Sequence, residues 1–190
     1  DCLSPSQGDE VMATLREIGV ATLFVNGTSP EDWEAVSELA EQVDEVIPSF
    51  GVHPWKEKDL TSGWEDVLLR YLPKHAEAGV GEIGLDKWIS GHDLPRQKEI
   101  FLEWLALAAS LGRSVSIHCL QAWGSLRDCM EQSPYAGPFL LHSYGGPKEM
   151  VDEWVARGAY FSLSGYFFRP EKTAKLEVFA SVPEDRILLE

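Results

Sequence analysis

The feature of this sequence that most constrains its fold is a regular alternation of amphipathic segments with short apolar runs. The apolar runs, typical of strands, cover residues 21–25, 46–50, 80–85, 114–118, 138–142, 159–163 and 186–190. Helical patterns or helix-start signals cover about 8–19, a segment opening at 29–32, and 63–78, 94–111, 122–132, 147–157 and 171–181. Strands that alternate with helices at this spacing indicate right-handed βαβ units and a parallel sheet.

One strand in front and one helix behind would complete an eightfold barrel. We therefore predict an α/β fold of the TIM-type (β/α)8 barrel class that lacks the first strand and the last helix. An open, doubly wound sheet is the alternative, because seven parallel strands can also stay open. No low-complexity linker interrupts the chain, so we expect residues 1–190 to form a single domain.

The composition argues against several functional classes. The formal net charge of −15 opposes general electrostatic binding to nucleic acid or anionic membranes, although metal ions could still bring phosphate in locally. The spacing of Cys2, Cys119 and Cys129 is unlike a disulfide framework or a zinc ribbon. The sequence contains no signal-peptide pattern and no apolar run near the roughly 20 residues of a membrane span. We expect a cytoplasmic protein without a membrane partner, and its oligomeric state stays open.

Four polar side chains lie at or near the ends of successive predicted strands: His53, Glu82, His118 and His142. A barrel builds its active site at this end of its strands. A single histidine in such a place more often has a structural role. A glutamate inside an apolar strand, however, needs a cation, a metal or several donors to offset its desolvation. Four such residues on one rim favour a shared site.

Imidazole nitrogens and carboxylate oxygens suit Zn, Mn, Fe or Ni, and a bridging glutamate would suit two ions. Glu82, His118 and His142 would then be one shared and two terminal ligands, too few for a complete binuclear site. A cysteine nucleophile is disfavoured because Cys119 follows His118 on a strand and points to the opposite face. The sequence has no G-x-S-x-G elbow and no Walker A loop.

These stretches resemble the TatD family of metal-dependent hydrolases, which have amidohydrolase-like barrels. The matching segments are GVHPW (51–55), VGEIGLDKW (80–88), SVSIHCLQAW (114–123), FLLHSYGG (139–146), YFSLSG (160–165) and RILLE (186–190). The resemblance implies two divalent metal ions, which would be Mg, Mn or Zn. It also implies phosphodiester hydrolysis, commonly as a deoxyribonuclease. It implies Glu82 as the bridging carboxylate, His118 and His142 as metal ligands, and His53 as a substrate-binding residue that contacts phosphate.

Two features of the family have no counterpart in this sequence. They are the H-x-H pair that closes the first strand and an aspartate that would fall beyond Glu190. We expect the 190 residues to be part of a longer protein, and loss of these ligands is the alternative. The general acid or base stays unknown, because that aspartate is the family's candidate.

We therefore predict a metal-dependent nuclease that cleaves DNA or another phosphodiester through metal-activated water. An amide or lactone hydrolase on the same barrel, or a binding protein with a decayed metal site, are the alternatives.

Aromatic and basic residues near the strand ends allow two interpretations each. Five aromatic residues closely follow strands: Trp55, Trp88, Trp123, Tyr144 and Tyr166. They could form a rim that stacks on bases, or they could pack the loops against the barrel mouth. The basic set 169, 172 and 175 could reach phosphates, but a solvated face is the favoured interpretation.

Overall fold

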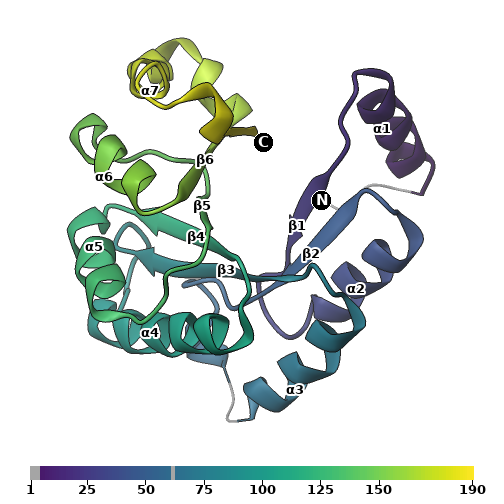
Figure 1. Ribbon diagram of the computed structural model, residues 1–190, viewed down its shortest axis with the longest axis horizontal. Helices are drawn as coiled ribbons and strands as arrows, with labels where there is room; N and C mark the ends of the chain where they lie inside the picture. The colour runs from purple at the N-terminus through teal and green to yellow at the C-terminus, as the bar shows by residue number, and fades with distance from the viewer. Residues whose placement is uncertain (1–4, 61–62) are drawn as a thin grey trace.

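The computed structural model describes residues 5–60 and 63–190, and its centre is a seven-stranded parallel sheet. The strands are β1 (Leu23–Asn26), β2 (Val46–Phe50), β3 (Gly79–Asp86), β4 (Val115–Leu120), β5 (Phe139–Leu141), β6 (Ala159–Leu163) and β7 (Ile187–Leu189). Each pairs in parallel with the next strand along the chain, so the spatial order is the sequence order. The sheet curls into an open ring with β1 and β7 at its two edges (Figure 1). The predicted α/β class and parallel sheet are confirmed.

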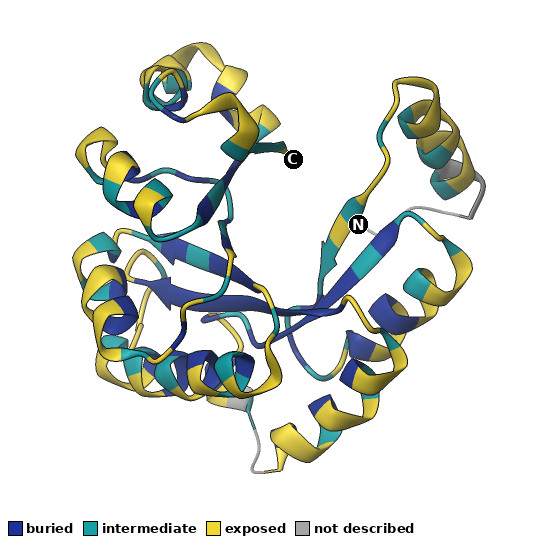
Figure 2. Cartoon of the chain, viewed as in Figure 1, coloured by how far each residue is buried: buried dark blue, intermediate teal, exposed yellow. Residues whose placement is uncertain are grey.

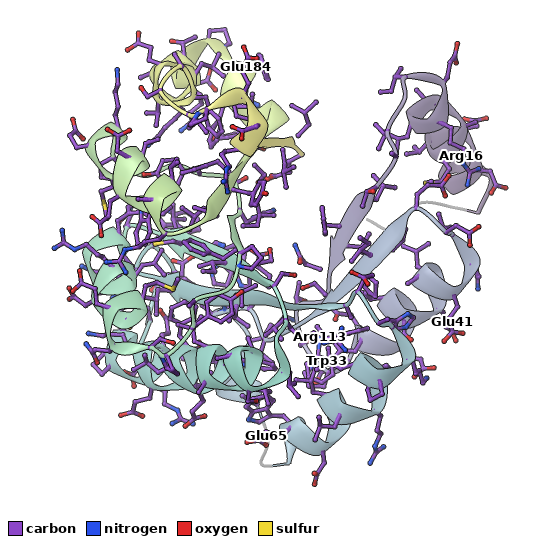
Figure 3. All side chains as sticks on the ribbon, viewed as in Figure 1. Arg16, Trp33, Glu41, Glu65, Arg113 and Glu184 are labelled. Atoms are coloured by element: carbon purple, nitrogen blue, oxygen red, sulfur yellow. The ribbon has the colours of Figure 1, made fainter. Side chains whose placement is uncertain are left out.

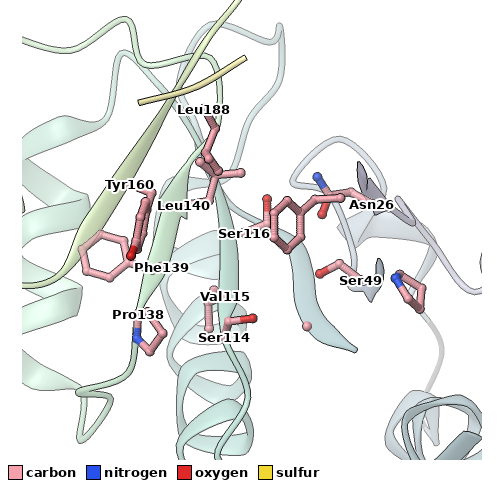
Figure 4. A pocket seen from close by; sticks show the side chains of 13 residues that line it. Asn26, Ser49, Ser114, Val115, Ser116, Pro138, Phe139, Leu140, Tyr160 and Leu188 are labelled. Carbon is pink, nitrogen blue, oxygen red and sulfur yellow. The ribbon is translucent and has the colours of Figure 1, made fainter. Parts of the chain in front are cut away.

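The curved sheet encloses a cavity. A cavity of about 380 Å³ lies on the concave side of the sheet (Figure 4). Every strand contributes to its lining, with Asn26, Ser49, Gly79, Ser116, Leu140, Tyr160 and Leu188 as one residue from each. A flat sheet could not direct residues from all seven strands toward one space, so the strands surround a common interior as they do in a barrel.

The helices cover the convex side of the sheet (Figure 1). They are α1 (Pro5–Glu17), α2 (Trp33–Gln42), α3 (Trp64–Tyr71), α4 (Leu94–Leu111), α5 (Trp123–Gln132), α6 (Val151–Ala156) and α7 (Thr173–Phe179). The bounds predicted for α4, 94–111, are confirmed. The helix begins and ends at these residues because both ends are capped. The Asp93 carboxylate accepts the backbone N–H of Arg96 at 3.1 Å, and Gly112 adopts a left-handed φ of 63°. None of the helices described is long and apolar enough to cross a membrane.

Tryptophans on the inner helix faces form much of the contact with the sheet. Trp33, Trp64, Trp104 and Trp154 are all buried, as Figure 2 shows for the helix faces in general. The rings of Trp64 and Trp104 lie 4.0 Å apart between their centroids, and Trp33 donates its indole N–H to the carbonyl of Gly51 at 3.0 Å. Figure 3 shows Trp33 on the sheet side, whereas Glu41 of the same helix points away from it.

The expected start of the second helix is wrong. The sequence predicts a helix that opens at 29–32, but α2 begins at Trp33. The Asp32 carboxylate accepts the backbone N–H of Thr28 at 2.9 Å and its hydroxyl at 2.6 Å. These bonds hold the preceding residues in a turn, and the helix starts only after it.

The helix expected over 63–78 is also shorter than predicted. It ends at Tyr71, and a 3₁₀ turn follows over Leu72–Lys74. Pro73 lies in that turn, and its missing N–H and fixed ring prevent the α-helix from continuing.

Candidate metal centre

A single carboxylate oxygen brings together all four residues that the sequence singled out. Oε1 of Glu82 lies 3.2 Å from Nδ1 of His118, 3.1 Å from Nδ1 of His142 and 4.0 Å from Nε2 of His53. Glu82 is part of β3 and only 7% exposed. Three neighbouring elements therefore deliver an imidazole each to one buried carboxylate.

A glycine in β3 makes the approach of His118 possible. Gly84 pairs in register with His118, and a Cβ on Gly84 would lie 1.9 Å from the His118 carbonyl oxygen. The φ of Gly84 is +150°, which side chains of L-residues rarely adopt. His118 lies inside β4 and not at its expected end, because the pairing with β3 continues to Leu120.

Backbone hydrogen bonds place the other two imidazoles. The N–H of His142 donates to the Ile117 carbonyl at 2.9 Å, so His142 stays in line with β4 after β5 has ended. The N–H of His53 donates to the Thr28 carbonyl at 2.8 Å, which ties the loop after β2 to the loop after β1. Both histidines are thus fixed by their main chains as well as by the site.

A second carboxylate orients His118. Asp86, the last residue of β3, is fully buried, and its Oδ2 lies 2.9 Å from Nε2 of His118. The same oxygen accepts the indole N–H of Trp55 at 2.8 Å, while Oδ1 accepts the backbone N–H groups of Trp88 and Ile89 at 2.7 and 2.9 Å. Both imidazole nitrogens of His118 therefore face carboxylates.

A third carboxylate plays the same part for His142. Oε2 of Glu190 lies 3.3 Å from Nε2 of His142. The hydroxyls of Ser143 and Ser162 donate to its two oxygens at 2.6 and 2.7 Å. Each of these two imidazoles is held between Glu82 on one side and another acid on the other.

Asp86 and Glu190 were not among the residues predicted for the site. A period-two pattern could have found Asp86, because positions 82, 84 and 86 share one face of a strand. Glu190 carries no comparable signal, since its contact with His142 depends on how β5, β6 and β7 pair.

The local charges settle the protonation of these groups. Burial opposes ionisation of Glu82, but hydrogen bonds with His118 and His142 reverse this and hold its pKa well below the usual range. Burial and the neighbouring His118 lower the pKa of His53 to about 4, which leaves its imidazole neutral at pH 7. Burial also disfavours a charge on His142, yet Glu82 and Glu190 raise its pKa above the ordinary value.

The donor set fits a divalent metal ion. His53, Glu82 and His118 offer ligand atoms that all lie within 4.8 Å of one another. Mixed imidazole and carboxylate donors suit Zn or Mn, and the contact of His118 with Asp86 matches the outer partner that metal-bound histidines usually have. This group of three includes His53, for which the family resemblance implies substrate binding. His142 is not one of the three, but it contacts Glu82 at 3.1 Å.

The neighbouring aromatic residues divide into two groups. Trp55, Trp88 and Tyr166 are 47%, 61% and 45% exposed, in keeping with a rim open to solvent. Tyr144 is fully buried against the ring of Trp123, with 4.8 Å between centroids, so for Tyr144 the structure favours the second interpretation, loop packing. Its hydroxyl reaches the Pro147 carbonyl instead, which fixes the loop after β5.

The thiol beside His118 does not take part in the site. Cys119 is only 5% exposed, and burial raises the pKa of its thiol far above the ordinary value. A neutral thiol is a poor nucleophile, which agrees with the prediction from the sequence that a cysteine nucleophile is disfavoured.

Comparisons with known proteins converge on one family. The sequence model described as TatD related DNase matches residues 3–190. The 3'-5' ssDNA/RNA exonuclease TatD of Cronobacter sakazakii is 31% identical over 96% of this chain and 70% of its own length. The protein of that name from Escherichia coli K12 is 26% identical over 96% of this chain and 71% of its own.

Two solved structures have the same fold. A TatD homologue from Escherichia coli K12 superposes with a TM-score of 0.84 and 24% identity over 99% of this chain and 74% of its own. A TatD family hydrolase from Entamoeba histolytica gives a TM-score of 0.83 and 20% identity over 96% of this chain and 64% of its own. The curled sheet is therefore part of a TIM-type barrel architecture and not an open, doubly wound sheet.

Proposed function

The chain belongs to the family of TatD-related DNases, and from this membership we propose that it hydrolyses phosphodiester bonds of nucleic acid with divalent metal ions. The observation that carries the proposal is the convergence of imidazoles from three elements on Oε1 of the buried Glu82. Relatives named as 3'-5' exonucleases of single-stranded DNA and RNA support a strand end as the substrate.

In this proposal Glu82 is shared between two ions of Mg, Mn or Zn, His118 and His142 are further ligands, and His53 contacts the phosphate. When bound, such ions stabilise the charge of an in-line displacement at phosphorus and lower the pKa of an attacking water. The ionised state of Glu82 supports its assigned role, because a ligand must be deprotonated to bind a metal.

The chain's own residues would orient the reacting groups. With a metal ion bound, Asp86 would accept the N–H at Nε2 of His118, which would leave the lone pair of Nδ1 for the ion. The neutral imidazole of His53 can donate one hydrogen bond to a phosphate oxygen without needing a charge. The exposed rings of Trp55 and Trp88 offer stacking surfaces beside the site for the bases of a single strand.

The test is a substrate panel with and without metal. Single-stranded DNA and RNA labelled at either end, a lactone and an amide are incubated with Mg, Mn or Zn and with EDTA. We expect metal-dependent shortening of the oligonucleotides from the 3' end. Hydrolysis of the lactone or amide alone would contradict the proposal, and the absence of both hydrolysis and bound metal would favour a binding protein with a decayed metal site.

A matched pair of variants tests the site itself. Glu82→Gln removes the charge at the shared position and is expected to lower the rate at least 100-fold, as loss of a central ligand should. Glu103→Gln removes a charge on the exposed side of α4 and is expected to leave the rate unchanged. Wild-type activity in Glu82→Gln would refute the assignment.

A further inference from the structure

A second cavity lies beside the metal centre, between the loops that follow β2 and β3. Its volume is about 290 Å³, and we call it the loop cavity. The first loop lines it with Pro54, Trp55, Glu57, Lys58 and Leu60. The second loop and the start of α4 line it with Ile89, Ser90, Gly91, His92, Asp93, Arg96 and Gln97. Both loops follow the strand ends that carry the metal centre, so the loop cavity opens on the same rim.

Two side chains of the loop cavity bind Asp86, one at its carboxylate and one at its backbone N–H. Trp55 donates its indole N–H to Asp86 at 2.8 Å, and the Gln97 side-chain oxygen accepts the Asp86 backbone N–H at 2.9 Å. Asp86 in turn contacts His118. The loop cavity and the metal centre are thus separated by the width of one side chain, close enough for neighbouring parts of one nucleotide to occupy both.

Several polar groups around the loop cavity have partners within it. Lys58 donates to the Gly91 carbonyl at 2.9 Å, and Asp93 accepts the backbone N–H of Arg96 at 3.1 Å. Within residues 5–60 and 63–190, no hydrogen bond to the Glu57 carboxyl group is present, although Glu57 is only 9% exposed. Glu57 lines the loop cavity, so its carboxyl oxygens are available to a ligand bound there.

The charges of the wall indicate what kind of ligand fits. Asp93 would repel a phosphate, whereas Lys58 and Arg96, the latter paired with Glu99 at 3.2 Å, would repel a metal ion. Burial raises the pKa of Glu57 to about 8, with Arg96 opposing the shift and Asp93 adding to it. A neutral ligand that donates an N–H group and has a flat face for Trp55 meets these conditions. A nucleobase with an exocyclic amino group has both properties.

Building on the proposed function, we propose that the loop cavity binds the amino-bearing base of a nucleotide next to the cleaved phosphate. A carboxyl oxygen of Glu57 accepts the exocyclic N–H of adenine, cytosine or guanine, and the indole of Trp55 stacks on the base. Thymine and uracil have no exocyclic amino group and gain less from Glu57. The enzyme therefore prefers strand ends with amino-bearing bases.

The experiment compares oligonucleotides that differ only in their last two bases, ending in dC-dC, dA-dA, dT-dT or two abasic residues. Cleavage rates are measured with Mn. Binding is measured by fluorescence anisotropy on the same strands with methylphosphonates at the last linkages, which block hydrolysis. A base-free substrate, bis(p-nitrophenyl) phosphate, reports on the metal centre alone. The proteins are the wild type, Glu57→Gln, Glu57→Met and the control Glu103→Gln.

We expect the wild type and Glu103→Gln to bind and cleave the dC and dA ends about tenfold better than the dT end, the size of one good base contact. Glu57→Gln keeps an acceptor oxygen and retains most of this preference. Glu57→Met removes the acceptor and lowers the dC and dA ends to the level of dT, while dT, abasic ends and the base-free substrate stay within about twofold.

Equal binding of all ends by the wild type, or a preference that persists in Glu57→Met, would overturn the assignment of the loop cavity. Cleavage of the base-free substrate then tells whether the proposed function still stands. Failure to hydrolyse any phosphodiester with any metal would refute the proposed function, and the binding comparison would still test the loop cavity by itself.

Discussion

Replacing Asp86 by Asn changes one atom in the contact network of His118, and its effects can be worked out atom by atom. The amide oxygen of Asn can still accept the backbone N–H groups of Trp88 and Ile89. Its NH₂ group then replaces Oδ2, which accepts the indole N–H of Trp55 at 2.8 Å and lies 2.9 Å from Nε2 of His118. Two donors would face each other at the Trp55 contact.

The free-energy cost follows from that one contact. A hydrogen bond to a charged group contributes about 1.5–3 kcal/mol, so Asp86→Asn should destabilise the fold by about that amount. For a chain of this size the change corresponds to a lowering of Tm by about 3–12 °C. The contact with His118 can be kept, because the imidazole can change tautomer and accept from the new NH₂ group at Nε2.

The new tautomer is the reason for a larger effect on metal binding. A proton on Nδ1 of His118 occupies the lone pair that faces Glu82, so this nitrogen can no longer bind a metal. Loss of such an outer partner typically costs about 10–100-fold in metal affinity. Thermal unfolding and calorimetric titration with Mn or Zn measure the two effects, with Glu103→Gln as the control. Unchanged metal affinity in a folded Asp86→Asn protein would refute the proposed role of Asp86.

Two further predictions concern a backbone approach and a buried acid. Gly84→Ala should lower the free energy of unfolding by more than about 3 kcal/mol, because its Cβ would lie 1.9 Å from the His118 carbonyl oxygen. Gly124→Ala in α5, with free space around it, should instead raise the free energy of unfolding by about 0.5–1 kcal/mol. Urea unfolding of both variants tests this, and equal effects would contradict it. Burial raises the pKa of Glu57 from its ordinary value of 4.5 to about 8, so the unfolded chain loses this proton first and wild-type stability falls as the pH rises between those values. Glu57→Gln should therefore raise Tm more at pH 8 than at pH 5, relative to the wild type, and a gain that does not change with pH would exclude the buried acid as its cause.

The sequence predicted most of the fold because the signals it uses are local. The bounds of α4 follow from the capping Asp93 and from Gly112, which a reader of the sequence can see. The second helix was misplaced because Asp32 bonds to Thr28 and not to the helix that it precedes. Choosing between two local bonding patterns requires the loop's geometry, which periodicity does not contain.

The candidate site was predictable to the same extent. Parallel strands end on one edge, so His53, Glu82, His118 and His142 could be expected to meet, and their contacts with Oε1 of Glu82 agree with that. The partners on the far side of two imidazoles could not be assigned in this way. Asp86 ends β3 and Glu190 directly follows β7, so the register of these strands decides whether the two acids reach a histidine, and register depends on pairing across the sheet.

The acidic composition acquires a specific meaning at this site. The three carboxylates of Glu82, Asp86 and Glu190 hold two imidazoles, so this end of the sheet has negative charge where a phosphodiester would have to approach. Such a centre repels phosphate until divalent cations occupy it, and it then attracts phosphate. The net charge of −15 therefore does not conflict with a nucleic acid substrate. In the proposed function, binding at the centre would depend on the metal, and recognition of the strand would rest on uncharged contacts such as those proposed for the loop cavity.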